Sequence, residues 1–135
     1  MKRVFLCAVL ALTTLAAATS ASAVGTVSVK VDSIATVTSA NSVVFDFDLY
    51  NCPAGEPIVV VDWTASEPSR PDSGAAAAGV PYGLSNGAAV QHLTLGVNSS
   101  SFLAGVQWVG SGNVACGDVV VPVAGSGHAT SLNGV

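Results

Sequence analysis

Charged residues are scarce in this sequence, and cations are the scarcest of them. Only 9% of the 135 residues are charged, with four Lys or Arg against eight Asp or Glu. Proteins that bind nucleic acid usually gather Lys and Arg into a patch that faces the phosphate groups. This sequence has no such patch beyond residue 3, so we expect no nucleic-acid partner.

Helical periodicity is missing as well. No window repeats apolar residues at the spacing of a helix with capping residues at its ends. Disordered chains also lack such a pattern, but they are poor in aliphatic residues and carry a high net charge. Because 50% of the residues are hydrophobic, with valine and alanine prominent, we expect this chain to fold.

One long apolar run is present, near the N-terminus. Lys2 and Arg3 precede "VFLCAVLALTTLAAA", and "SASA" then supplies the small residues that fit cleavage after Ala23. The run is shorter than the roughly 20 residues of a membrane-spanning helix, and threonines interrupt it. The sequence predicts a signal peptide at 1–23 and a secreted single domain at 24–135, with no membrane span after the signal is removed. That domain keeps two cations against eight carboxylates, a formal net charge of −6.

Cysteine is limited to three residues, and Cys7 lies within the predicted signal peptide. Export brings Cys52 and Cys116 to a compartment in which thiols oxidise. A reactive Cys52 would need a neighbour that stabilises the thiolate, yet the charges near it are acidic. Zinc would need further ligands at suitable spacing, and His92 and His128 form no cluster with the cysteines. We predict a Cys52–Cys116 disulfide, no metal site and no cofactor.

Alternation of apolar and polar residues predicts six strands. They lie in "TVSVKVDS", "SVVFDFDLY", "PIVVVDWTA", "AVQHLTLGV", "FLAGVQWVG" and "DVVVPV". A seventh strand is expected in "TVTSANS" or near "GVPYGL". Strands that are apolar on one face bury it by closing into two packed sheets or a barrel. The predicted fold class is therefore all-β, with about seven antiparallel strands.

The two tryptophans are predicted to fill the core. Trp63 shares one face of its predicted strand with Val59 and Val61, and Trp108 also shares its face with apolar residues. Trp63 follows Cys52 by eleven residues, and Cys116 follows Cys52 by 64.

This spacing resembles the Cys, Trp, Cys rhythm of immunoglobulin domains. The sequence departs from that pattern because Cys52 is followed at once by the turn "PAG" and because Val114 stands where those domains have a tyrosine. The resemblance implies an immunoglobulin-like antiparallel β-sandwich with its disulfide displaced to one end.

A second resemblance covers most of the mature chain. It is carried by "CPAGEPIVVVDWTASE", "SNGAAVQHLTLGV" and "FLAGVQWVGSGNVACG". These segments resemble small secreted immunoglobulin-like single-domain proteins of actinobacteria, in which a "CPAG" turn precedes a strand and a later cysteine opens the next. This sequence has Ser85 and Asn86 ahead of Gly87 where that pattern places a cysteine. The resemblance implies export and a β architecture, and it implies no activity.

The interval 66–87 lacks strand periodicity and carries Pro, Gly, Ser and an alanine run. It is predicted to be a long connection. One interpretation is a surface crossover without a function. The other is a loop that presents Arg70 and Tyr82 to a partner, since binding residues often lie on loops.

Catalytic signals are weak. There is no Gly-x-Ser-x-Gly motif, and neither histidine has an evident acidic partner along the chain. Asp46 and Asp48 share the outward face of one strand and are interpreted as solvated carboxylates rather than calcium ligands. We expect that the chain is not an enzyme.

Three functions remain as hypotheses. The favoured one is an exported, non-catalytic β-sandwich module with a binding or structural role outside the cell. The alternatives are a carrier of a small apolar ligand, similar to the chromoprotein apoproteins of actinobacteria, and an inhibitor of secreted hydrolases that acts through the 66–87 loop. The partner would be a protein or a surface. Self-association through the C-terminal strand is also predicted, because only Asp118 and Pro122 protect the edge formed by "DVVVPV", in which Val120 would face outward.

Overall fold

The computed structural model describes residues 25–132, so the predicted signal peptide at 1–23 lies outside the described residues. Within residues 25–132, no helix is long and apolar enough to cross a membrane. The described chain forms eight strands: β1 (Ser28–Val31), β2 (Ile34–Ser39), β3 (Ser42–Tyr50), β4 (Pro57–Ser66), β5 (Gly74–Leu84), β6 (Val90–Ser100), β7 (Gln107–Cys116) and β8 (Val119–Ser131).

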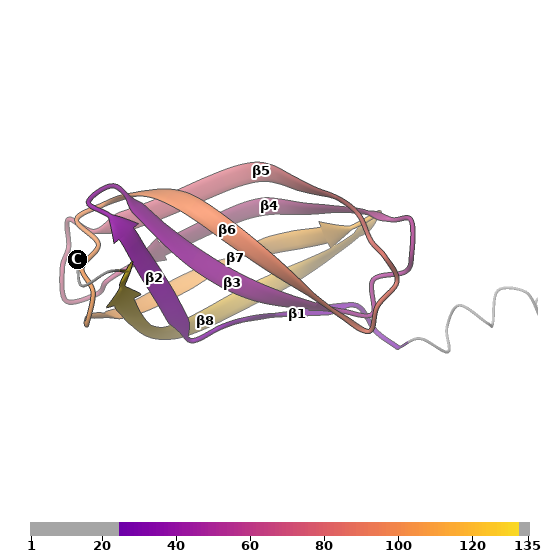
Figure 1. The fold of residues 1–135 in the computed structure, drawn as a ribbon, viewed down its shortest axis with the longest axis horizontal. Coiled ribbons are helices and arrows are strands. Elements are labelled where there is room, and N and C mark those ends of the chain that lie inside the picture. The colour runs from indigo at the N-terminus through magenta and orange to yellow at the C-terminus, as the bar shows by residue number, and fades with distance from the viewer. Residues whose placement is uncertain (1–24, 133–135) are drawn as a thin grey trace, which may run out of the picture.

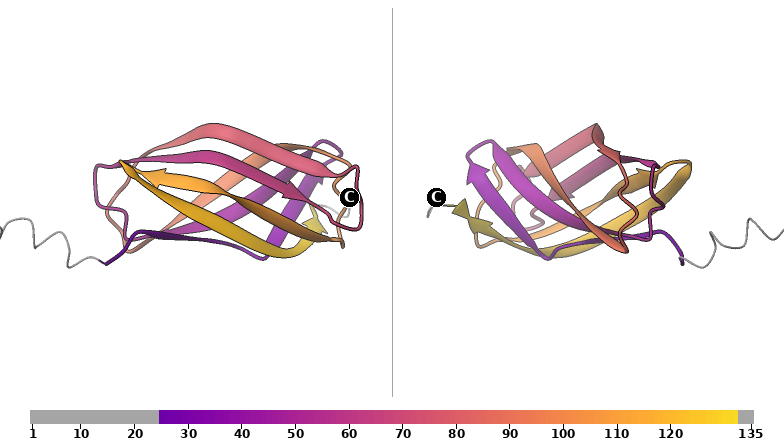
Figure 2. Two further views of the ribbon diagram at one scale, coloured as in Figure 1. Left: turned by 180° about the vertical axis from the view of Figure 1, so that it is seen from behind. Right: turned by 45° about the vertical axis from the view of Figure 1, so that its right-hand side comes forward.

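Seven of these strands close into a barrel (Figure 1). The order around it is β3, β2, β8, β7, β4, β5, β6 and back to β3, while β1 pairs with the second half of β3. Seen from behind in Figure 2, β5, β4, β7 and β8 lie side by side. All neighbouring strands are antiparallel except β2 and β8, which run parallel. The barrel is therefore mixed.

The all-β prediction is confirmed, whereas the immunoglobulin-like antiparallel sandwich is not, because the structure is a mixed barrel. The physical reason lies in β2. After a bend at Ser33, the chain enters β2, which bonds to β3 on one side and to β8 on the other. One strand thus belongs to both sides of the molecule. In a sandwich of two separate sheets, each strand would belong to one sheet only.

The barrel is closed by two short pairings at the same end. Residues 74–76 of β5 pair with 98–100 of β6, and residues 34–37 of β2 pair with 128–131 of β8. We call this the hydrogen-bonded end. Beyond it, residues 77–84 of β5 pair with β4 alone.

The predicted Cys52–Cys116 disulfide is present at the opposite end, the disulfide end. It joins the segment after β3 to the last residue of β7, with 5.9 Å between the two Cα atoms. Ser85 lies beside it and donates from Oγ to the carbonyl oxygen of Cys52 at 2.8 Å. Ser85 therefore contacts Cys52 through a hydrogen bond beside the disulfide.

Aromatic side chains fill the barrel, as predicted for both tryptophans. Trp63 and Trp108 are fully buried, and the ring of Phe45 packs edge-on against them at centroid distances of 5.2 and 5.0 Å. Glycines make room for the indoles: a side chain at Gly110 would collide with the ring of Trp63.

A β-bulge in β4 changes which valines accompany Trp63. The register slips between Val60 and Asp62, so Val61 and Asp62 both face solvent. Ile58 and Val60 therefore share the inner face with Trp63, and the prediction that Val59 and Val61 share a face with Trp63 is wrong. Three successive valines carry no polar mark that would locate the extra residue.

The prediction of a long connection at 66–87 is also wrong, because half of this interval is β5. Alanine and glycine occupy both faces of that strand, so no contrast between apolar and polar residues marks it. Gly79 and Gly83 adopt φ values of 63° and 82°, which further interrupt the pattern. Both places proposed for a seventh strand, one in β2 and one in β5, are strands.

The C-terminal strand is not a simple edge. Residues 119–127 of β8 pair with β7 alone, His128 pairs with both β7 and β2, and residues 129–131 pair with β2. Val120 is 56% exposed, as expected for an outward position. Self-association through this strand stays a prediction, which a lower association of a Val120→Lys variant in sedimentation experiments would support.

Candidate functional site

Two clefts lie on the outer side of the barrel, and both include Thr64. The outer cleft, about 750 Å³, is lined by Asp62, Thr64, Ser111, Gly112, Asn113, Pro122, Val123 and Ala124. The end cleft, about 550 Å³, is lined by Thr64, Ala65, Gly74, Ala75, Ala76, Asn98, Ser99 and Ser100. Together they cross five strands, from β8 to β6.

Strand register arranges the outer cleft in two rows. Asp62 on β4 lies opposite Asn113 on β7, which lies opposite Pro122 on β8. In the next row Thr64 lies opposite Ser111, and Ser111 lies opposite Ala124. Residues two apart on a strand share a face, so the polar groups of both rows point outward together. The cleft thus presents a carboxylate, an amide and two hydroxyls beside two small apolar side chains.

The bulge in β4 sets the position of Asp62. If the register of Val60 with Val114 continued without interruption, Asp62 would lie opposite Gly112. The inserted residue places it opposite Asn113 instead, and the Asn113 Nδ2 donates to the Asp62 carboxylate at 3.2 Å. Bulges commonly re-aim a side chain next to a functional site.

Gly112 forms the floor between these groups. A side chain there would collide with the carbonyl oxygen of Asp62, so only glycine allows β7 to approach the bulged β4. Gly112 thus sets how closely β7 packs against the bulge in β4 beside the cleft.

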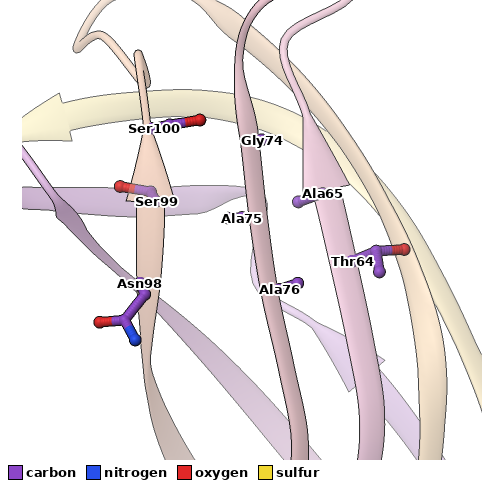
Figure 3. A pocket seen from close by; sticks show the side chains of 8 residues that line it. All are labelled: Thr64, Ala65, Gly74, Ala75, Ala76, Asn98, Ser99 and Ser100. Atoms are coloured by element: carbon purple, nitrogen blue, oxygen red, sulfur yellow. The ribbon is translucent and has the colours of Figure 1, made fainter.

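Small side chains line the end cleft (Figure 3). Its three strands lie side by side, with Asn98 and Ser99 on β6, Ala75 and Ala76 on β5, and Thr64 on β4. Thr64 lies opposite Ala76, and Ala76 lies opposite Asn98, so this row continues the one in the outer cleft. The Oγ of Ser99 is buried without a hydrogen-bond partner among the described residues.

The structure separates the two residues predicted for a partner-binding loop. Arg70 lies between β4 and β5, where its Nε donates to the carbonyl oxygen of Ser101 at 3.1 Å and lies 3.4 Å from Glu67 Oε1. Glu67 is fully buried and accepts a hydrogen bond from the Leu103 N–H at 2.9 Å. Arg70 therefore helps to hold two loops together.

Tyr82 belongs to β5 and lies along the barrel wall. Its hydroxyl donates to the carbonyl oxygen of Thr94 on β6 at 2.9 Å, where the two strands no longer pair. Partial burial raises the pKa of the Tyr82 phenol above its ordinary value of 10.0. Tyr82 thus bridges β5 and β6.

One histidine has an acidic partner that the sequence did not reveal. His92 on β6 lies opposite Asp48 on β3, and His92 Nδ1 contacts the Asp48 carboxylate. The His92 side chain is 81% exposed, so this pair lies in solvent. The outward positions predicted for Asp46 and Asp48 agree with the alternating burial of β3. No group of three His, Cys, Asp or Glu residues that would hold a metal is found within residues 25–132.

Sequence reasoning missed the outer cleft entirely. Its key pair, Asp62 and Asn113, lies 51 residues apart in the chain, and only the register of β4 with β7 brings the two together. Comparison of the sequence with known protein families and with curated proteins gives no match.

Proposed function

We propose that this chain is an exported, non-catalytic β module that works by binding a partner outside the cell, with its outer and end clefts as the binding surface. The observation that supports the proposal is the outward row formed by Ser111, Thr64, Ala76 and Asn98, in which three of the four residues are polar. Binding sites combine small apolar contacts with a few convergent polar groups, and this surface has both.

The interior supports surface binding over the carrier hypothesis. A carrier of a small apolar ligand needs an internal space, whereas the rings of Phe45, Trp63 and Trp108 contact one another inside the barrel. The inhibitor hypothesis also loses support, because most of 66–87 is strand and Arg70 is engaged with Glu67 and Ser101.

The proposal that the module is non-catalytic is supported by the placement of the side chains that most resemble catalytic groups. The His92 and Asp48 pair is exposed, and the nearby Thr94 hydroxyl donates to Asp46 at 3.1 Å instead of to the histidine. A general base acts on a hydroxyl within hydrogen-bond reach, and this hydroxyl is already engaged.

We further propose that the barrel is a variation on an immunoglobulin-like two-sheet arrangement. Among the described residues, the strands of its two halves, β1-β3-β6 and β8-β7-β4-β5, pair with each other through the short β5–β6 pairing, and β2 links the halves through its pairings with β3 and β8. An experimental structure in which the β5–β6 pairing extends well past residue 77 would contradict this relation.

The binding role is tested with two variants of the secreted protein. Thr64→Arg places a long cation where the clefts join, and Ser28→Arg places the same group on β1, which pairs with β3 alone. Both sites are exposed, so both variants should keep the melting temperature of the wild type. The measurement is the fraction of protein that sediments with the cells that secrete it.

The proposal expects that wild type and Ser28→Arg sediment with the cells while Thr64→Arg stays in the medium. Equal sedimentation of all three proteins would place the binding surface elsewhere. Recovery of all wild-type protein from the medium would contradict a binding role at the surface of these cells.

A further inference from the structure

We propose that the ligand of the outer cleft is a neutral, linear oligosaccharide whose hydroxyl groups bind Asp62 and Asn113. This inference rests on the proposed binding function, because it names the ligand of the same surface. It is based on the hydrogen-bond donors and acceptors that the bulge in β4 and the pairing register of β7 with β4 bring together.

The Asp62 and Asn113 pair offers both hydrogen-bonding roles side by side. The carboxylate oxygens of Asp62 accept, and one Nδ2 proton of Asn113 already donates to Asp62 Oδ1 at 3.2 Å. Among residues 25–132, no other group occupies the second Nδ2 proton, the Asn113 carbonyl oxygen or the remaining lone pairs of Asp62. Two hydroxyls on adjacent ring carbons of a sugar can donate to the carboxylate and accept from the amide at once. A hydrogen bond to an ionised carboxylate is the stronger kind.

The hydroxyls of Thr64 and Ser111 extend this arrangement to the next row. Each hydroxyl both donates and accepts, which matches a ligand whose own groups do the same. Pro122 and Ala124 flank the polar groups on β8 and provide apolar contact for the C–H groups of a sugar ring.

Charge decides between neutral and anionic ligands. Asp62 is the one charged residue that lines either cleft, and neither lining includes Lys or Arg. An anionic sugar or a phosphate would lie beside a carboxylate on a chain with an excess of acidic residues. The cleft therefore favours a neutral saccharide.

The length of the row that joins the two clefts favours an oligosaccharide over a single sugar. The row runs from Ser111 on β7 across β4 and β5 to Asn98 on β6. Neighbouring strands lie roughly 4.8 Å apart, so three strand spacings extend over about 14 Å. A chain of several sugar rings laid across the strands would reach both clefts.

The test uses the mature secreted protein and a panel of probes. The neutral probes are cellohexaose, maltohexaose, mannohexaose and chitohexaose, and the anionic probe is an oligogalacturonate of the same length. Binding is followed by amide chemical shifts in two-dimensional NMR up to about 10 mM ligand, a range that covers weak affinities. We expect at least one neutral hexasaccharide to bind, with shifts concentrated on β4 and β7, and no binding of the oligogalacturonate.

Two variants that each remove one negative charge test whether the ligand binds in the outer cleft or elsewhere on the surface. Asp62→Asn should weaken binding at least about tenfold, because it removes a charge-assisted hydrogen bond. Asp118→Asn, in the turn between β7 and β8, should leave the affinity unchanged. Melting temperatures of both variants report whether either change disturbs the fold.

Failure of all neutral probes, or equal affinity of Asp62→Asn and wild type, would overturn the saccharide assignment. Preference for the oligogalacturonate would overturn it as well. The binding role itself would still stand if Thr64→Arg released the protein from the cells, so the two proposals fail separately.

Discussion

Removal of the Cys52–Cys116 disulfide should lower the free energy of unfolding by about 4 kcal/mol in the chain-entropy description of a cross-link. The bond spans a sequence separation of 64 residues, and without it the unfolded chain gains the freedom of that loop. Because both cysteines are buried, alanine is the suitable replacement at each position. The perturbation is thus Cys52→Ala together with Cys116→Ala.

The position of the disulfide adds to this expectation. The barrel is closed by strand pairing at the hydrogen-bonded end, while the disulfide joins β3 to β7 at the opposite end. Loss of the bond should loosen the disulfide end first. In hydrogen exchange, amides at 114–116 should lose more protection in the variant than amides at 34–37.

Tryptophan fluorescence during thermal unfolding is the direct assay, since Trp63 and Trp108 are fully buried. A loss of about 4 kcal/mol corresponds to a fall of roughly 15 °C in the melting temperature of a domain of this size. Alkylation of the folded wild-type protein without reductant should modify neither cysteine.

A loss of less than about 1 kcal/mol in the double variant would refute the reasoning, because it would mean that cross-linking of the unfolded chain contributes little. Hydrogen bonds such as that of Ser85 with Cys52 would then hold the disulfide end. Uniform loss of protection at both ends of the barrel would refute the positional argument alone.

Three further predictions concern single side chains. Glu67→Ala removes a buried hydrogen-bond acceptor and should lower the free energy of unfolding, measured in urea, by about 2 kcal/mol. Glu56→Ala, at an exposed position, should change it by less than about 0.5 kcal/mol. Equal effects of the two variants would contradict a stabilising role of the buried Glu67. Gly112→Ala should destabilise by about 2 kcal/mol through collision with the backbone of β4, and Gly96→Ala, which meets no atom within 4 Å, serves as the control. Because the pKa of Tyr82 is raised in the folded state, its contribution to stability is present below pH 10.0 and is lost as the pH rises through the folded-state pKa. Tyr82→Phe should therefore flatten the fall in stability at alkaline pH. An unchanged slope of stability against pH would count against burial of the phenol.

The sequence was sufficient for features that depend on local contrast or on simple counting. Alternation of apolar residues with Asp46 and Asp48 located β3, and the even count of two cysteines outside the predicted signal peptide led to the disulfide. The burial of Trp63 followed from its apolar strand. These inferences need no knowledge of which strands are neighbours.

Other features depend on long-range register, which a single sequence does not carry. β5 was predicted only as one of two places for a seventh strand, near "GVPYGL", because alanine and glycine give both faces of the strand the same character. The bulge was missed because an extra valine among valines leaves no mark in the pattern. The outer cleft exists only because β4 and β7 pair in the register that joins Asp62 to Asn113.

The collision of a side chain at Gly110 with the ring of Trp63 has a consequence for how this chain can change. The two residues lie on adjacent strands and divide one fixed volume between them, the larger share going to the indole. A larger residue at position 110 requires a smaller residue at position 63, because a close-packed interior has no space for two large side chains there. Any relative of this protein should therefore show the sizes of these two residues changing in opposite directions, as though they were a single position in the sequence.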